Sequence, residues 1–156
     1  MANPKSNQEH TESLLELILQ LVKFCQAKEQ YFANSHNLTT VELRCLQHFK
    51  TNYCASVKEL SQGMELTSGR ITHIITSLEK KKLITREIDE NDRRGINVCL
   101  TKKAIPFTQV LNKSYIELHE KILENIPIKK RKSIIKALAE LVRAFVVWNE
   151  NKENNN

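Results

Sequence analysis

Glycine and proline are scarce in this sequence, with three residues of each type among 156. Because these residues end helices and build tight turns, their scarcity predicts long helices with few sharp breaks. No apolar run approaches the roughly 18 residues that a membrane-spanning helix needs, so no membrane association is expected. The polar residues 1–10 also lack the apolar stretch of a signal peptide, which favours a cytoplasmic protein.

Sites for metals, cofactors and catalysis are also missing. The four cysteines form no Cys-x-x-Cys pair, and no two histidines stand one helical turn apart. The sequence contains no glycine-rich phosphate loop, no nucleophile elbow and no His-Glu-x-x-His motif. We therefore predict no metal site, no cofactor and no enzymatic activity, and we expect reduced thiols in the cytoplasm.

Positive charge is in excess, with 24 Lys and Arg against 18 Asp and Glu, a net charge of +6 and a pI near 9.2. Such a balance favours an anionic partner such as nucleic acid. Hydrophobic residues make up 40% of the chain, which is enough for a core. The length fits one domain, or one compact lobe with an attached dimerisation region.

Two capping boxes begin short helices in the middle of the chain. In each box a hydroxyl and a carboxylate three residues apart bond to each other's backbone N–H groups, first at Thr39 and Glu42, then at Ser56 and Glu59. Thr67 can cap a third helix that reaches about Lys82. Two short helices joined by a tight turn, the second amphipathic and basic, predict a helix-turn-helix.

A hairpin is predicted directly after these helices. Residues 83–88 and 95–100 are short, alternating and rich in β-branched side chains, and a charged tip, 89–94, lies between them. This pattern is typical of a β-wing. The predicted fold class is therefore mainly α with a small β-wing, with a winged helix-turn-helix DNA-binding lobe over residues 39–101.

The terminal segments predict a helical dimerisation region over residues 11–38 and 102–150, with flexible tails at 1–10 and 151–156. The last helix repeats apolar residues at steps of four and three, a heptad seam that lets two helices mesh. The seam could also be used within one chain, but the central lobe offers little surface to such wide apolar faces. The candidate dimerisation residues are Leu14, Ile18, Leu21, Leu138, Leu141, Phe145 and Trp148.

The third helix has two contrasting faces. At 100° per residue, its isoleucines and Leu78 gather on one side, which must face the core. Polar side chains on the other side can bond to base edges or neutralise phosphates, although a merely solvated face is the alternative. The candidate DNA-binding residues of this helix are Ser68, Gly69, Arg70, Thr72, His73, Thr76 and Lys80.

The hairpin tip supplies two further DNA-binding candidates, Arg93 and Arg94. At the far end of a two-stranded ribbon, they could reach into a narrow, electronegative minor groove. The neighbouring Asp92 would repel phosphate, so we interpret it as a residue that pairs with one arginine and orients it. A sequence-specific duplex-DNA-binding protein is the leading interpretation, and a winged-helix module that binds only proteins is the alternative.

The segment from Val57 to Thr101 resembles the MarR family of winged-helix regulators. The resemblance lies in Ile71-Thr72-His73 with Leu78-Glu79-Lys80-Lys81, and in Asp92-Arg93-Arg94 followed by Leu100-Thr101. It implies a homodimeric transcriptional regulator, more commonly a repressor, with Arg94 in the minor groove of a pseudo-palindromic operator and a small hydrophobic effector. The sequence departs from the family pattern at Lys82 and Ala104, where glycine is usual. Either a lysine in a left-handed helix end costs about 1 kcal/mol, or this helix end has a different geometry.

The resemblance also raises thiol-based redox sensing as an alternative mode of regulation. Cys25 lies on the apolar stripe of the first helix, which favours a buried structural thiol. Cys54 follows Tyr53 in a polar turn and is the more accessible redox candidate. Cys99 belongs to a strand and should alternate into the core.

Overall fold

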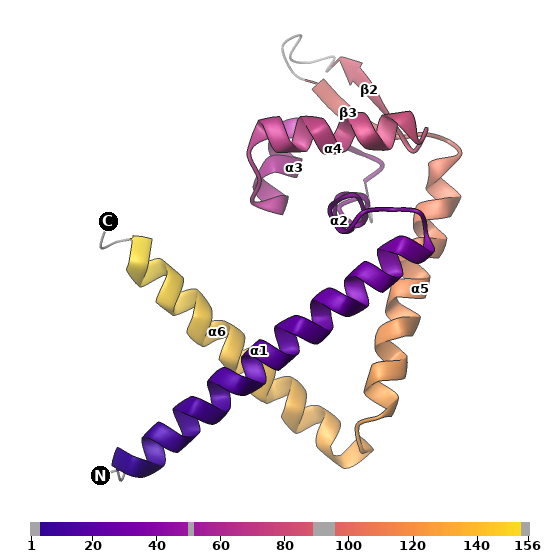
Figure 1. The fold of residues 1–156 in the computed structure, drawn as a ribbon. Coiled ribbons are helices and arrows are strands. Elements are labelled where there is room, and N and C mark those ends of the chain that lie inside the picture. The colour runs from indigo at the N-terminus through magenta and orange to yellow at the C-terminus, as the bar shows by residue number, and fades with distance from the viewer. Residues whose placement is uncertain (1–3, 50–51, 89–95, 154–156) are drawn as a thin grey trace. The chain divides into compact units, whose positions relative to one another are not determined.

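The computed structural model describes residues 4–49, 52–88 and 96–153, and Figure 1 labels their helices and strands. The elements of this described part are mainly helices with one small antiparallel sheet, which confirms the predicted fold class. In chain order they are α1 (Pro4–Ser35), α2 (Thr40–Gln47), β1 (Cys54–Ser56), α3 (Val57–Met64), α4 (Ser68–Lys80), β2 (Ile84–Ile88), β3 (Ile96–Leu100), α5 (Ala104–Glu124) and α6 (Ile128–Glu153).

Both predicted capping boxes are present. Thr39 N donates to Glu42 Oε2 at 2.7 Å, while Glu42 N donates to Thr39 Oγ1 at 3.3 Å. Ser56 N donates to Glu59 Oε2 at 2.7 Å, and Glu59 N donates to Ser56 Oγ at 3.1 Å. These bonds satisfy backbone donors that the first turn of a helix leaves free, so they fix where α2 and α3 begin.

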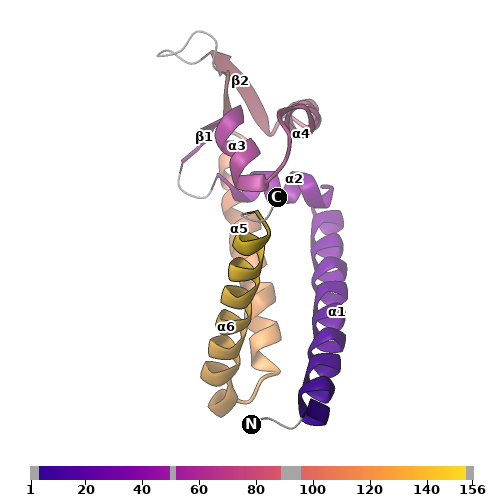
Figure 2. The ribbon, with the colours of Figure 1, turned by 90° about the vertical axis from the view of Figure 1, so that its left-hand side faces the viewer.

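The sheet has three strands in the order β1-β3-β2, and both pairs are antiparallel. The predicted wing accounts for β2 and β3, but the sequence analysis placed Cys54 in a turn and missed β1. A strand of three residues is too short for alternation to reveal it. The register sets Cys54 opposite Cys99 and Ser56 opposite Asn97. β1 therefore pairs with the wing strand β3 and leads directly into α3, and Figure 2 shows β1 beside α3.

The chain forms two units, residues 1–112 and 113–156. The core of the first unit collects apolar side chains from α2, α3, α4, β3 and the beginning of α5. Each fully buried Leu or Ile contributes roughly 1.5–3 kcal/mol relative to an exposed one. The largest fully buried apolar side chains are Phe49, Leu43, Leu46, Leu60, Ile71, Ile75, Leu78, Leu111 and Val98.

Two residues beyond the end of α4, Lys82 has a left-handed backbone conformation with φ 61°. Lys82 N donates to Glu79 O at 2.8 Å and Leu83 N donates to Leu78 O at 3.0 Å. These two bonds are the pair that define a Schellman motif. The helix end therefore keeps the geometry for which glycine is best suited, although the sequence supplies a lysine there.

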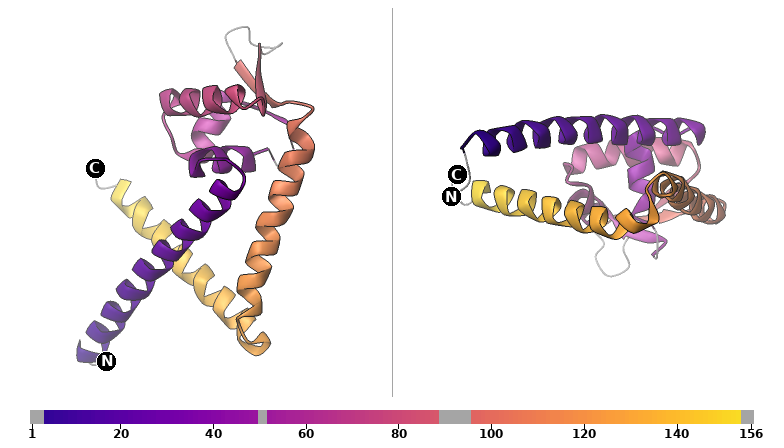
Figure 3. Two further views of the ribbon diagram at one scale, coloured as in Figure 1. Left: turned by 45° about the vertical axis from the view of Figure 1, so that its right-hand side comes forward. Right: turned by 90° about the horizontal axis from the view of Figure 1, so that it is seen from below.

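The first helix is longer than the sequence indicated. The prediction of a flexible tail over residues 1–10 is wrong for residues 4–10, because α1 begins at Pro4. Proline suits a first helical position, and polar bonds one turn apart continue the helix without apolar side chains, from Gln8 to Glu12 and from Thr11 to Asn7. Likewise α6 extends to Glu153, so residues 151–153 are helical. Figure 3 shows α1 as one uninterrupted helix.

Large apolar side chains remain exposed on helices of both units. In the first unit, Leu14 and Leu21 of α1 expose 45% and 48% of their surface. In the second, Leu138 and Trp148 of α6 expose 43% and 59%. Within the described ranges, no helix is both long and apolar enough to span a membrane.

Candidate nucleic-acid interface

Helix α4 buries one face and exposes the other, as the periodicity predicted. Ile71, Ile74, Ile75 and Leu78 are buried in the core of the first unit. Of the candidate DNA-binding residues on this helix, Thr76 is half-buried and the others are exposed, namely Ser68, Gly69, Arg70, Thr72, His73 and Lys80. Figure 1 shows α4 beside α3, and both belong to the same unit as the sheet.

The N-terminus of α4 is open to an incoming backbone. Thr67 caps it by accepting a bond from Arg70 N at 3.5 Å. A Cβ added to Gly69 would meet no heavy atom within 4 Å, so the space beside this residue is empty. Free N–H groups and the positive end of the helix dipole favour a phosphate there.

Part of the exposed face is already bonded within the protein. Thr72 Oγ1 donates to Ser68 O and Thr76 Oγ1 donates to Thr72 O, each at 2.9 Å. Thr76 Oγ1 also accepts a 2.6 Å bond from Arg86 Nη2. The Thr76 hydroxyl thus both donates and accepts a hydrogen bond within the protein, so Thr76 is less suited to contacting a base than Thr72 or His73.

The sequence analysis missed Arg86, which lies on β2. Besides its bond to Thr76, its Nε approaches Glu79 Oε2 to 3.4 Å, so one guanidinium connects the wing to α4. A signal was available in the sequence. Residues two apart in a strand share a face, and Ile84 is an apolar core candidate, so Arg86 should face the same side.

Side chains of α3 next to α4 were also not foreseen from the sequence. A hollow of about 420 Å³ opens between α3, α4 and β3, with Lys58 and Gln62 on one wall and Thr72 on the other. Ser61 Oγ of α3 also bonds to Leu66 O, which closes the turn between the two helices. Lys58 and Gln62 thus add a cation and an amide beside the polar surface of α4.

At the opposite end of α4, a buried carboxylate anchors the helix to α2. Ser77 Oγ donates to Glu42 Oε1 at 2.7 Å, and Lys81 Nζ donates to Glu42 Oε2 at 2.7 Å. Burial alone would raise the pKa of Glu42, but the hydrogen bonds from Lys81, Ser77 and the Thr39 backbone, with the charge of Lys81, lower it below its ordinary value.

The residues predicted at the wing tip, Asp92, Arg93 and Arg94, lie outside the described residues. Their predicted roles therefore stay predictions. No group of three or more metal-ligating side chains occurs in the part of the chain that the structure describes.

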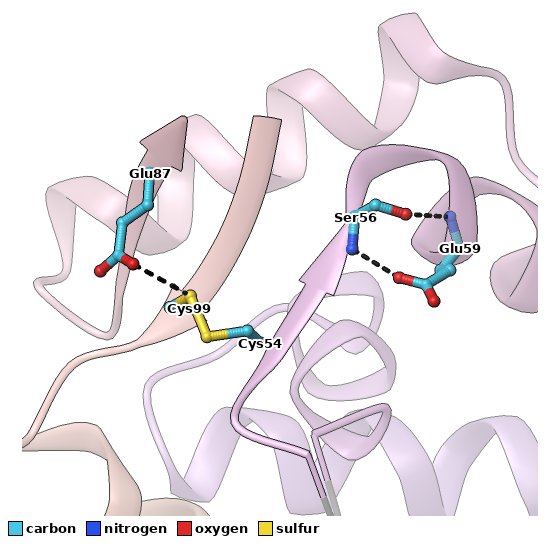
Figure 4. The surroundings of a disulfide bond; sticks show 5 residues. All are labelled: Cys54, Ser56, Glu59, Glu87 and Cys99. Atoms are coloured by element: carbon cyan, nitrogen blue, oxygen red, sulfur yellow. Dashed lines mark hydrogen bonds between the residues drawn. A yellow bond between two sulfur atoms is a disulfide. The ribbon is translucent and has the colours of Figure 1, made fainter. Parts of the chain in front are cut away.

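The prediction of reduced thiols is wrong for one pair of cysteines. Cys54 and Cys99 form a disulfide with a Cα–Cα distance of 4.0 Å, because the unforeseen strand β1 places them opposite each other (Figure 4). Cys99 is buried, as expected from its strand. Cys25, expected to be buried, is exposed in the single chain, whereas Cys45 is buried. Among the described residues of its own unit, no element covers the face of α1 that carries Cys25.

Residues 38–96 match the MarR family. The winged part of the chain thus resembles this family. SarZ, a transcriptional regulator of Staphylococcus haemolyticus, is 27% identical over 78 residues, which are 50% of this chain and 53% of SarZ. The chain thus spans about half the length of that relative. Such relatives are transcriptional regulators and not enzymes, in agreement with the prediction.

Solved structures confirm the fold. A mutant of MarR from E. coli has a TM-score of 0.69 at 18% identity, over 83% of this chain and 96% of that one. The MepR–DNA complex of S. aureus has a TM-score of 0.70 at 16% identity, over 85% and 97%. The resemblance to the MarR family that the sequence indicated is confirmed.

Proposed function

We propose that this protein is a sequence-specific transcriptional regulator of the MarR type that binds duplex DNA as a homodimer. The observation that carries the proposal is the exposed polar face of α4, which includes Arg70, Thr72 and His73, on a helix whose opposite face is locked in the core. The names of the relatives support it, because SarZ is a transcriptional regulator and MepR has been crystallised with DNA.

In this proposal α4 enters the major groove with its N-terminus close to the phosphate backbone. Thr72 and His73 can exchange hydrogen bonds with base edges, while Arg70 and Lys58 neutralise phosphates. Arg94, with Asp92 to orient it, is assigned to the neighbouring minor groove. With two-fold symmetry the operator is a pseudo-palindrome whose half-sites lie about one helical turn apart.

The homodimer is supported by the apolar surface that each unit leaves exposed. The α1 candidates Leu14 and Leu21 and the α6 candidates Leu138, Phe145 and Trp148 are all exposed to between 43% and 59%, and Ile18 and Leu141 are half-buried. Large exposed apolar patches are unusual on soluble monomers and mark interaction surfaces, and each of these helices carries such a stripe. A second copy of the chain, with the same two stripes, is the occupant that we assign to them.

Repression and release by a small hydrophobic effector complete the proposal. A hollow of about 660 Å³ in the first unit, between α2 and α3, has the size of a ligand pocket and carries Val41, Met64 and Leu66 beside Arg44 and His48. Arg44 is already paired with Glu29, through Nε to Oε1 at 2.6 Å and Nη2 to Oε2 at 2.5 Å, so the hollow supports an effector that is mainly apolar.

The test is selection of duplexes from a random pool by the purified full-length protein, followed by fluorescence-anisotropy titration with unrelated duplex as competitor. We expect a pseudo-palindromic site and binding that weakens with salt by a log–log slope of roughly 0.9 per neutralised phosphate. Arg70→Ala and Arg94→Ala should each weaken binding roughly 5- to 150-fold, as for the loss of 1–3 kcal/mol. Arg143→Ala, which removes the same charge from α6, should not. Equal binding to selected and unrelated duplexes would favour the protein-interaction module.

The oligomeric state is tested by sedimentation of the same protein. The native chain should sediment as a dimer, and Leu21→Glu should shift it towards the monomer, while Gln26→Glu, at another exposed position of α1, should leave it unchanged. A native chain that sediments as a monomer at the concentrations used for DNA binding would contradict the homodimer.

A further inference from the structure

Two cysteines far apart in the sequence meet in the sheet that carries the wing. Cys54 of β1 and Cys99 of β3 are 45 residues apart, and their strands pair with these two residues directly opposite. The adjacent pair is joined by a backbone bond, from Leu100 N to Tyr53 O at 2.7 Å. In an antiparallel ladder the next pair along is the non-hydrogen-bonded type, whose side chains lie closest. The strand pairing therefore places the two sulfurs opposite each other.

The stretch of chain between these cysteines contains the proposed DNA-reading elements. It includes α3, α4 and β2, so the disulfide closes a covalent loop around them. β1 ends at Ser56, which is also the N-cap of α3 and bonds to Glu59 (Figure 4). The disulfide thus links the wing strand β3 to the strand that leads into the Ser56–Glu59 capping box of α3. Helix α3 in turn packs on α4.

The two sulfurs differ in access. Cys54 is exposed, whereas Cys99 exposes 5% of its surface. Cys99 Sγ lies 3.6 Å from Glu87 Oε2, and Figure 4 shows this carboxylate reaching it from β2. A reagent from solvent therefore meets Cys54 first, and when the bond is open Glu87 can accept the Sγ–H of Cys99. Exposed disulfides are typically the labile ones, with a regulatory or catalytic role, whereas shielded ones are structural.

We infer that Cys54 and Cys99 form a reversible thiol switch in which the disulfide is the DNA-binding state and the dithiol binds DNA more weakly. The inference rests on the proposed function, since it names the regulation of that same interface. β1 has only three residues, so once the bond opens only a short ladder holds it to the wing. In the reduced protein the wing and α3 then lose more conformational freedom when they bind DNA. The disulfide form is preorganised and therefore binds DNA more tightly.

The oxidant is a hydroperoxide and the reductant a dithiol. The Cys54 thiolate attacks one oxygen of hydrogen peroxide, the O–O bond breaks, and Cys54 becomes a sulfenic acid as the released hydroxide takes a proton to form water. Cys99 then attacks that sulfur, forming the S–S bond and releasing a second water. Two thiols and one peroxide give one disulfide and two waters, with two electrons passing from sulfur to oxygen.

Reduction runs through the exposed sulfur. A thiolate of the dithiol attacks Cys54 Sγ, and Cys99 leaves as a thiolate and takes up a proton. The second thiol of the reductant then displaces Cys54 and closes a cyclic disulfide, so the two electrons return to the protein sulfurs. No other cysteine of the chain takes part in either direction.

The experiment uses the full-length protein carrying Cys25→Ser, which removes the other exposed thiol but keeps the pair. One arm counts thiols by mass spectrometry after N-ethylmaleimide labelling, following dithiothreitol and then hydrogen peroxide. We expect two labels to appear at Cys54 and Cys99 on reduction and to disappear on oxidation. A pair that stays oxidised in dithiothreitol, or stays reduced in peroxide, overturns the switch. This arm needs no DNA.

The second arm measures affinity for the selected duplex in both states. Reduction should weaken binding roughly fivefold or more, as expected for lost preorganisation, and peroxide should restore it. Cys54→Ser and Cys99→Ser, with their fold checked by circular dichroism, should bind like the reduced protein and ignore both reagents. Equal affinity in both states, or tighter binding when reduced, overturns the inference and leaves the regulator standing. Failure to bind any duplex in either state overturns both, while the thiol count still reports the chemistry of the pair.

Discussion

Lys81 donates a 2.7 Å hydrogen bond from its Nζ to Oε2 of Glu42, which places a cation at the end of α4 against a carboxylate at the start of α2. The Glu42 side chain is 3% exposed and that of Lys81 is 31% exposed. The same Nζ donates to Asn37 O at 2.7 Å. One ammonium group therefore fixes three parts of the first unit, the turn after α1, α2 and the candidate recognition helix.

Replacing Lys81 by methionine should destabilise the protein by about 2–4 kcal/mol, because the charge of Glu42 would stay buried without its cation. Urea unfolding gives the free energy. Lys80→Met removes the same charge from an exposed neighbour and should change stability by less than about 0.5 kcal/mol. Adding Glu42→Gln to Lys81→Met should recover part of the loss. Equal effects of the two lysine variants would mean that the pair contributes nothing beyond surface charge.

Stability should fall in acid through Glu42. Its pKa in the folded protein is lowered, so the unfolded chain binds the proton more readily. The contribution is therefore complete above the unfolded pKa, about 4.3, and is lost as the pH falls below that value towards the lower pKa of the folded state. Urea unfolding between pH 7 and pH 3 should show a shallower acid loss for Glu42→Gln. Parallel curves for the two proteins would assign the acid sensitivity to other groups.

Lys82→Gly should stabilise the protein by about 1 kcal/mol, since a left-handed lysine carries a steric cost that glycine lacks. The bond from Leu83 N to Leu78 O keeps that backbone conformation in place. Lys80→Gly, in the last turn of α4, should destabilise by roughly 0.5–1 kcal/mol through its poor helix propensity. Thermal or urea unfolding of both variants supplies the comparison. A loss of stability in both would indicate that the helix end does not require the left-handed residue.

Arg86 should act through the shape of its guanidinium and not through charge alone. It reaches Thr76 Oγ1 at 2.6 Å and Glu79 Oε2 at 3.4 Å, and a lysine cannot hold both in the same fork. Arg86→Lys and Arg86→Ala should both weaken binding of the selected duplex about fivefold, as for a lost hydrogen bond of roughly 1 kcal/mol. Anisotropy titration tests this. If Arg86→Lys bound the selected duplex with native affinity, the charge of Arg86 alone would account for its role.

Cys45 should be inert towards thiol reagents in the folded protein. Burial, with a smaller contribution from the charge of Glu42, raises its pKa from 9.0 to about 12. The thiolate fraction near neutral pH is then lower by ~1,000-fold than for an ordinary thiol. N-ethylmaleimide should label the exposed Cys25 and leave Cys45 unlabelled until urea is added. Prompt labelling of Cys45 without denaturant would reveal local opening of α2.

Signals between residues a few positions apart were enough to predict the helix starts set by capping boxes and the two faces of α4. The capping boxes at Thr39 and Ser56 set the starts of two helices because their bonds join residues three positions apart. The two faces of α4 followed from its apolar period. The MarR resemblance gave the order of the elements. It also marked Lys82 as unusual, which the left-handed backbone at that residue explains.

Contacts between distant segments were beyond such signals. Ser77 and Lys81 meet Glu42 across 35 and 39 residues, and a capping-box carboxylate gives no sign that it will be buried. Arg86 contacts α4 only because the wing strand β2 packs beside that helix. The strand β1 exists because β3 offers it a partner, and three residues carry no period of their own.

The sequence by itself determined where α2, α3 and α4 begin, which face of α4 is apolar, and the winged-helix order of the elements, because hydrogen bonds and side-chain periods of a few residues decide these features. Only the tertiary structure decided that Glu42 is a buried anchor, that Arg86 connects the wing to α4, and that Cys54 meets Cys99. Each of these depends on which segments pack together, and packing is a property of the whole core.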